Sequence, residues 1–145
     1  MKVIALSGVY DSGKTTVLFE LLHQLKQMNN VTALNNQSSI PSSYGRDKRE
    51  LLQINGNQIL RVGICTGGDT KPIVQQNFDF FTANNCDICI TACRSVASTE
   101  TVKEVLRSAG NVNVYPYFVA KMKTSSTWQQ RADAQTVSQL LSMIY

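Results

Sequence analysis

The sequence has a single histidine and no long hydrophobic run, and each absence excludes a class of protein. A site built on several imidazole ligands is excluded. His23 itself falls on the polar side of a helical pattern, which predicts a surface residue rather than a catalyst. No apolar run approaches the roughly 20 residues that span a bilayer, so we expect no membrane partner. The apolar start, Val3 to Leu6, is too short for a signal peptide and predicts a strand.

Cysteine is also scarce, and the four residues of this type do not form a pattern that binds a metal. Cys86, Cys89 and Cys93 read C-x-x-C-x-x-x-C within a stretch of strand composition. Side chains alternate between the faces of a strand, which predicts Cys89 and Cys93 on one face and Cys86 on the other. Zinc normally takes four converging ligands. We therefore expect these three residues and Cys65 to be buried free thiols, with no metal site made of cysteine.

Charged residues make up only 17% of the chain, with a net charge of +4 and a pI near 9.0. This balance permits acidic partners, including nucleotides and nucleic acid. The basic residues are scattered, however, and their one cluster, Arg46-Asp47-Lys48-Arg49, is interrupted by an acid. We therefore favour a solvated loop over a nucleic-acid footprint.

The length and the periodicity predict one α/β domain over residues 1–145. Strand patterns alternate with helical patterns, which is typical of three layers around a mostly parallel central sheet. Strands are expected at residues 2–7, 31–34, 51–54, 58–65, 86–93 and 112–119, and helices at about 14–30, from 71, at 98–109 and at 126–144.

One part of the sheet should be antiparallel. Asn55-Gly56 separates two strand patterns, and this pair favours a tight hairpin because both turn positions prefer positive φ. We expect one antiparallel hairpin strand at the edge of the sheet, with the second hairpin strand beside the first strand of the chain. The polar stretch Asn35 to Gly45 predicts a long loop that is either functional or merely floppy.

The most specific pattern is GVYDSGKTT from Gly8 to Thr16, which matches G-x-x-x-x-G-K-[ST]. Glycines let backbone amides surround an anion, the lysine adds a cation, and the helix that follows presents its positive end. On these residues the chain resembles the P-loop NTPase superfamily. The resemblance implies that a nucleotide binds at Gly8, Tyr10, Asp11, Ser12, Gly13, Lys14, Thr15 and Thr16.

The same resemblance implies a Mg²⁺ ion. Its expected ligands are the Thr15 hydroxyl and Asp69, the latter acting through water just past the 58–65 strand. Arg94 follows another strand and is the expected charge donor toward a transferring phosphoryl group. In an open α/β sheet, ligands gather beyond the carboxyl ends of the strands. Lys14, Asp69 and Arg94 are therefore the predicted catalytic residues.

The sequence indicates less clearly which nucleotide base the site would bind. The order G-x-x-D-x-G-K-T-T, with Asp11, is similar to the loop of translational GTPases. Those proteins carry D-x-x-G and N-K-x-D, however, where this chain has Thr66-Gly67-Gly68-Asp69 and Ala120-Lys121-Met122-Lys123. Adenine is then the better default. The S-G-K-T-T segment also looks like that of nucleotide kinases and of the molybdopterin-guanine dinucleotide biosynthesis adaptor family.

Three functions stay open at this point. The first is a small cytoplasmic phosphotransferase of the kinase type, using ATP or another NTP with Mg²⁺, in which Arg94 with Arg46 or Arg49 would hold a small-molecule acceptor. The second is an NTP-hydrolysing switch that acts through a protein partner. The third is a P-loop domain that binds nucleotide without turnover.

Overall fold

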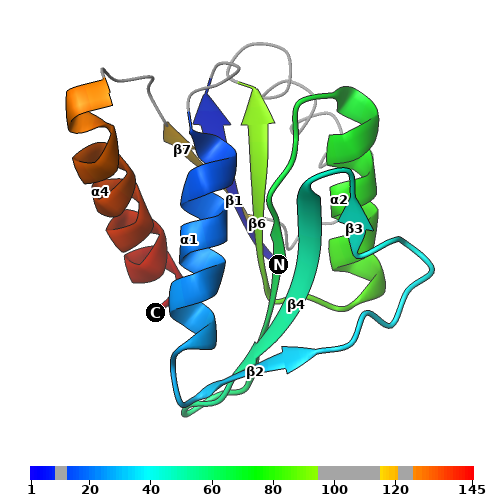
Figure 1. Ribbon diagram of the computed structural model, residues 1–145. Coiled ribbons are helices and arrows are strands. Elements are labelled where there is room, and N and C mark those ends of the chain that lie inside the picture. The colour runs from blue at the N-terminus through cyan, green and yellow to red at the C-terminus, as the bar shows by residue number, and fades with distance from the viewer. Residues whose placement is uncertain (9–12, 95–114, 121–125) are drawn as a thin grey trace.

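The computed structural model describes residues 1–8, 13–94, 115–120 and 126–145, and they form a mixed α/β unit (Figure 1). Six strands make an open sheet in the order β2-β4-β5-β6-β1-β7, and the two-residue β3 pairs additionally with β4. Within these residues, no helix combines the length and the apolar character needed to cross a bilayer.

The observed elements follow the predicted order. The helix expected at 98–109 and residues 112–114 of the last expected strand lie outside the described residues. The strands are β1 (Lys2–Gly8), β2 (Val31–Leu34), β3 (Ser43–Tyr44), β4 (Asp47–Ile54), β5 (Leu60–Cys65), β6 (Ile88–Arg94) and β7 (Tyr115–Ala120), and the helices are α1 (Lys14–Lys26), α2 (Lys71–Ala83) and α4 (Ser126–Ile144).

Helices cover both faces of the sheet because the strands alternate apolar side chains between the faces. Ile4 and Leu6 of β1 belong to the large core beneath α1 and α4. Val3 and Ala5 point the opposite way, into the smaller clusters beneath α2. This arrangement confirms the α/β class and places α1 and α4 side by side on one face (Figure 1).

The prediction that the second hairpin strand lies beside the first strand is wrong. β6 lies between them, parallel to both, with Ile90 opposite Ile4 on one side and Ile64 on the other. A strand that pairs on both sides and is covered on both faces can be apolar along its whole length. Asp87, just before β6, accepts hydrogen bonds from the backbone amides of Lys2 and Arg61, so its role at that end is structural.

The antiparallel hairpin exists, but it differs from the predicted one in two ways. β4 is not the edge strand, because β2 pairs antiparallel with its outer side. The β4–β5 link is also wider than a two-residue turn, and positive φ in the described chain occurs only at Gly13, Gly45 and Asn85. The reason is a tertiary contact: the Asn55 amide donates to the Asn30 carbonyl at 2.8 Å, which ties the turn to the α1–β2 link.

All four cysteines are buried free thiols, as predicted, but Cys86 is not placed as predicted. Cys65, Cys86 and Cys89 share the core cluster between the sheet and α2, so Cys86 does not lie on a separate face. Strand alternation fails there because β6 begins only at Ile88. Burial raises the pKa of the Cys65 and Cys89 thiols well above the ordinary value.

Candidate functional site

The carboxyl ends of the parallel strands and the first turns of the helices meet at one rim of the sheet, at the top of Figure 1. Gly8 ends β1 there, and the register places it opposite Arg94, the last residue of β6. α1 begins at the same rim with Lys14. Ligands of open α/β sheets bind at this kind of edge. The predicted phosphate loop therefore starts and ends at the expected place.

Gly13 is the N-cap residue of α1. Its backbone is left-handed, with φ 93° and ψ 15°, a conformation that glycine adopts at little cost. Its carbonyl accepts the first helical hydrogen bond, from the Val17 amide at 3.0 Å. Glycine has no side chain with which to cap the helix, so the first-turn amides remain oriented toward the rim.

Lys14 is held close to the end of β1. The residue is only 5% exposed, and its ammonium donates to the Gly8 carbonyl at 2.9 Å. A buried ammonium needs hydrogen-bond acceptors or anions around it. The contact keeps the cation beside the segment that the sequence motif assigns to phosphates.

Thr15 links the motif to the end of β5. Its hydroxyl donates to the Thr66 carbonyl at 3.3 Å, directly after β5. The Thr66 hydroxyl accepts from the Lys48 amide at 2.9 Å and donates to Asp47 Oδ1 at 3.1 Å. Two hydrogen-bonded steps therefore join the predicted Mg²⁺ ligand to a carboxylate on β4.

Asp47 was not predicted as a site residue. Ligands of open α/β sheets are expected at the carboxyl ends of parallel strands, whereas Asp47 is the first residue of an antiparallel strand. Reversing a strand brings its amino end to the rim where its parallel neighbours end. The signal that could have found it is the predicted hairpin itself, combined with the acid inside Arg46-Asp47-Lys48-Arg49.

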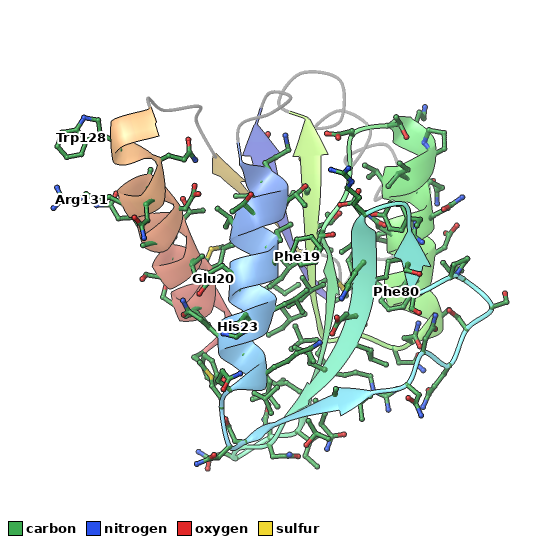
Figure 2. The ribbon with its side chains drawn as sticks, viewed as in Figure 1. Phe19, Glu20, His23, Phe80, Trp128 and Arg131 are labelled. Carbon is green, nitrogen blue, oxygen red and sulfur yellow. The ribbon has the colours of Figure 1, made fainter. Side chains whose placement is uncertain are left out.

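Lys48 points away from Asp47, as alternation along β4 requires. Its ammonium lies 6.0 Å from the centre of the Phe19 ring on α1, and Figure 2 places Phe19 on the side of α1 that faces β4. Lys48 thus belongs to the α1 face of the sheet, and Asp47 and Arg49 belong to the α2 face.

Arg49 cannot hold a small-molecule substrate, because its side chain is buried and engaged within the protein, so the role predicted for it is wrong. The side chain is 1% exposed, and each of its nitrogens donates to a neutral acceptor. Nε donates to Asn77 Oδ1 at 2.9 Å, Nη1 to the Pro41 carbonyl at 2.9 Å and Nη2 to Gln76 Oε1 at 3.0 Å. The guanidinium therefore joins β4 to α2. Arg46 is exposed.

Asn77 extends this contact to the rim. It is fully buried, and its amide donates to the Gly67 carbonyl at 2.7 Å and to the Thr91 hydroxyl at 3.0 Å. The apolar periodicity of α2 did not indicate a buried asparagine. Its position is explained by the carbonyl that it satisfies, because Gly67 lies beyond the β5 ladder and has no strand partner there.

The remaining predicted residues have less defined surroundings. Asp69 is exposed and lies three residues past Thr66, just before α2, whose N-cap is Thr70. Arg94 lies at the rim by its backbone, while its side chain is outside the described part. Tyr10, Asp11 and Ser12 lie outside the described residues, as do Lys121 to Lys123. Thr16 is exposed on α1.

The loop from residue 35 to residue 45 packs against α2. The buried Asn84 accepts from the Gln37 amide at 2.8 Å and donates to Asn36 Oδ1 at 3.2 Å. Arg49 holds the Pro41 carbonyl of the same loop. Two buried polar side chains thus give the loop a defined path, which its polar composition did not indicate.

A second surface feature is a groove of about 830 Å³ between α1 and α4, which includes Phe19 and Glu20. Its polar groups bond along their own helices, such as Gln24 to Glu20 at 3.1 Å and Gln129 to Asp133 at 2.8 Å. Trp128 and Arg131 lie on the side of α4 turned away from α1 (Figure 2).

Comparison with protein-family models, with curated proteins and with solved structures gives no match to this chain.

Proposed function

We propose that this chain adopts a three-layer P-loop fold, binds ATP with Mg²⁺, and acts as a small cytoplasmic phosphotransferase of the kinase type. The observation that carries the proposal is the meeting of three motif residues at one rim. The left-handed Gly13 opens the start of α1, the buried Lys14 lies against Gly8, and the Thr15 hydroxyl faces the end of β5. Amides, an ammonium and a hydroxyl are the groups that a nucleotide phosphate with its metal needs.

The residues fit a magnesium ion by the chemistry of their donors. The Thr15 hydroxyl uses its proton on the Thr66 carbonyl, which leaves the lone pairs of its oxygen for a cation. Mg²⁺ prefers oxygen ligands and commonly takes few from the protein, the rest coming from water and phosphates. The metal would supply charge neutralisation at the phosphates, and Lys14 would supply a second cation.

A thermal-shift comparison of ATP, GTP and their diphosphates, with and without Mg²⁺, tests the binding step. A ligand that binds only the folded state raises the free energy of unfolding by about 2.7 kcal/mol at a hundredfold excess over Kd. The melting temperature rises as a result. We expect ATP to stabilise more than GTP and Lys14→Ala to abolish both effects. Equal or larger stabilisation by GTP would overturn the choice of adenine.

Transfer assays with labelled ATP and a panel of nucleosides, nucleotides and other small hydroxyl compounds test the reaction. Label should appear on one class of acceptor and disappear with Lys14→Ala. Failure to label any acceptor, with ATP binding intact, would remove the kinase function and leave the binding site.

A nucleotide switch is the second candidate, and a specific observation favours it. From Gly67, hydrogen bonds run through Asn77 and Arg49 to Pro41 in the loop at residues 35–45. A change at the phosphates that moved Thr66 and Gly67 would therefore reach a surface segment that a partner protein could read. Hydrogen exchange of this loop should then differ between the ATP-bound and ADP-bound states, and identical exchange would end this candidate.

A further inference from the structure

We propose that Asp47, at the start of β4, is the carboxylate that positions the nucleotide-bound Mg²⁺, acting across Thr66 on the water shell of the metal. The inference rests on the proposed nucleotide site and adds a residue to it that no sequence motif identifies. Asp69, the acid that the sequence predicts for this role, is the competing candidate.

The first step is the relation between Thr15 and Thr66. Thr15 donates its hydroxyl proton to the Thr66 backbone carbonyl at 3.3 Å. The carbonyl orients the hydroxyl but brings no charge. Mg²⁺ sites commonly add one or two carboxylates to the phosphates and waters, so a carboxylate near Thr15 would complete the ligand set.

The second step is the fixed direction of the Thr66 hydroxyl. Its oxygen already accepts from the Lys48 amide, so its one proton goes to Asp47 Oδ1. Thr66 is fully buried, and this pair of hydrogen bonds locks the Asp47 side chain at the rim. The carboxylate is thereby held in one place before any ligand arrives, which is the preorganisation that an ion site requires.

The third step is the space around the second carboxylate oxygen. A side-chain carbon on Gly67 would lie 2.6 Å from Asp47 Oδ2 and 2.5 Å from the Tyr44 hydroxyl. The carboxylate and the Tyr44 hydroxyl therefore occupy the space that a side chain on Gly67 would need. Asp47 therefore lies directly over the Thr66–Gly67 segment that also contacts Thr15.

Hydrogen bonds, rather than closeness in the sheet, relate Asp47 to the phosphate loop. β6 separates β5 from β1, and β4 lies beyond β5, so the link from Asp47 to Thr15 runs through Thr66. The Thr66 hydroxyl donates to Asp47, and the Thr66 carbonyl accepts from Thr15. Asp69 is exposed and lies three residues past Thr66, just before α2.

The test compares Kd values for ATP, measured by calorimetry on the full chain in excess Mg²⁺ and in EDTA. The wild type should bind more tightly with Mg²⁺. Asp47→Asn should lose about tenfold or more of this gain, the effect of removing a charge-assisted interaction, while affinity in EDTA stays the same or improves. Asparagine keeps the size of the side chain and an oxygen that can accept from Thr66.

Asp69→Asn tests the competing carboxylate, and the proposal requires Asp47→Asn to lose more of the Mg²⁺ gain than Asp69→Asn does. The reverse result, with Asp69→Asn losing the gain and Asp47→Asn keeping it, overturns the proposal, as does a gain kept by both variants. Absence of ATP binding by the wild type, or binding unchanged in Lys14→Ala, instead overturns the proposed function and the role of Asp47 with it.

A second pair of variants separates positioning from folding. Thr66→Ser keeps the hydroxyl and should keep the Mg²⁺ gain, whereas Thr66→Val should lose most of it. Circular dichroism of each variant without ligand checks that it folds. If Thr66→Val folds and keeps the full gain, Asp47 does not act across Thr66 and the proposal fails.

Discussion

The Arg49 guanidinium carbon lies 3.8 Å from the centre of the Tyr44 ring, so a fully buried positive charge rests on an aromatic face beside the candidate site. The partners of its nitrogens are two side-chain amides and one carbonyl, all neutral. The ring contributes the attraction of its negative face toward the cation. This contact and the hydrogen bonds fix the segment around Tyr44 and the start of β4 to α2.

Replacing Arg49 should therefore be costly. Arg49→Ala would leave the Asn77, Gln76 and Pro41 oxygens without their donor and open a cavity, for an expected loss of about 3–4 kcal/mol in the free energy of unfolding. Arg49→Lys should lose somewhat less, because it keeps the charge but not the fork of donors. Urea denaturation measures both. Arg46→Ala, at an exposed position nearby, should change stability by no more than about 0.5 kcal/mol.

Tyr44→Phe should leave stability unchanged or raise it by up to about 1 kcal/mol. The Tyr44 hydroxyl is buried and makes no hydrogen bond of normal length and angle among the described residues. Burial raises its pKa, and the Asn77 amide lies near enough to offset part of that rise. Removing the hydroxyl therefore relieves a desolvation cost. The ring stays and keeps its contact with Arg49. A loss of more than about 1 kcal/mol in thermal or urea unfolding would show that the hydroxyl has a partner in solution.

Gly68→Ala should destabilise the protein by about 2–4 kcal/mol. A side-chain carbon built on Gly68 would lie 1.7 Å from the Ala92 carbonyl oxygen, and this neighbour is backbone of a central strand that cannot turn aside. Gly56→Ala is the matched control, since the nearest atom there is 3.7 Å away and the added carbon should be tolerated. Equal melting temperatures for the two variants would contradict the packing of Gly68 against β6.

Stability should fall in alkaline solution. The pKa values of the Cys65 and Cys89 thiols and of the Tyr44 hydroxyl are raised by burial above the ordinary 9.0 and 10.0. These groups lose their protons first in the unfolded state, so the unfolded state binds fewer protons and the free energy of unfolding decreases as pH rises. Their contribution is fully present below pH 8 and declines above about pH 9 for the thiols and above about pH 10 for Tyr44, by about 1.4 kcal/mol per pH unit for each group.

Urea titrations at a series of pH values from 7 to 11 check this expectation. Cys65→Val removes one titrating group. The free energy of unfolding of this variant should therefore fall less steeply between about pH 9 and pH 11 than that of the wild type. A profile that stays level throughout the alkaline range would show that the thiols ionise in the folded protein as well.

Much of the fold could be predicted from local patterns. The Lys2–Gly8 strand, the Pro72 start of α2 and the apolar stripe of α4 were all indicated by periodicity and by turn residues. The place of β6 in the sheet could not be predicted from the sequence. Strand order depends on tertiary packing, and every buried parallel strand looks equally apolar.

The candidate site could likewise be predicted only in part. Gly8, Gly13, Lys14 and Thr15 could be found because consecutive residues supply the backbone shape and the charges. The different roles of Asp47 and Arg49 could not be predicted, because the two residues lie only two positions apart in one basic stretch. Alternation and an antiparallel partner determine that Asp47 contacts Thr66 and that Arg49 is buried against Asn77.

The burial of every thiol has a practical consequence for studying this chain. Modifying reagents attack exposed thiolates, and Cys65, Cys86, Cys89 and Cys93 are all enclosed in the folded core. A cysteine introduced at an exposed position such as His23 or Trp128 should therefore react with a maleimide dye far faster than the natural residues. Fluorescent or spin-labelled protein could then be prepared while the natural core stays intact, and a slow uptake of reagent by the unlabelled protein would report directly on opening of the sheet.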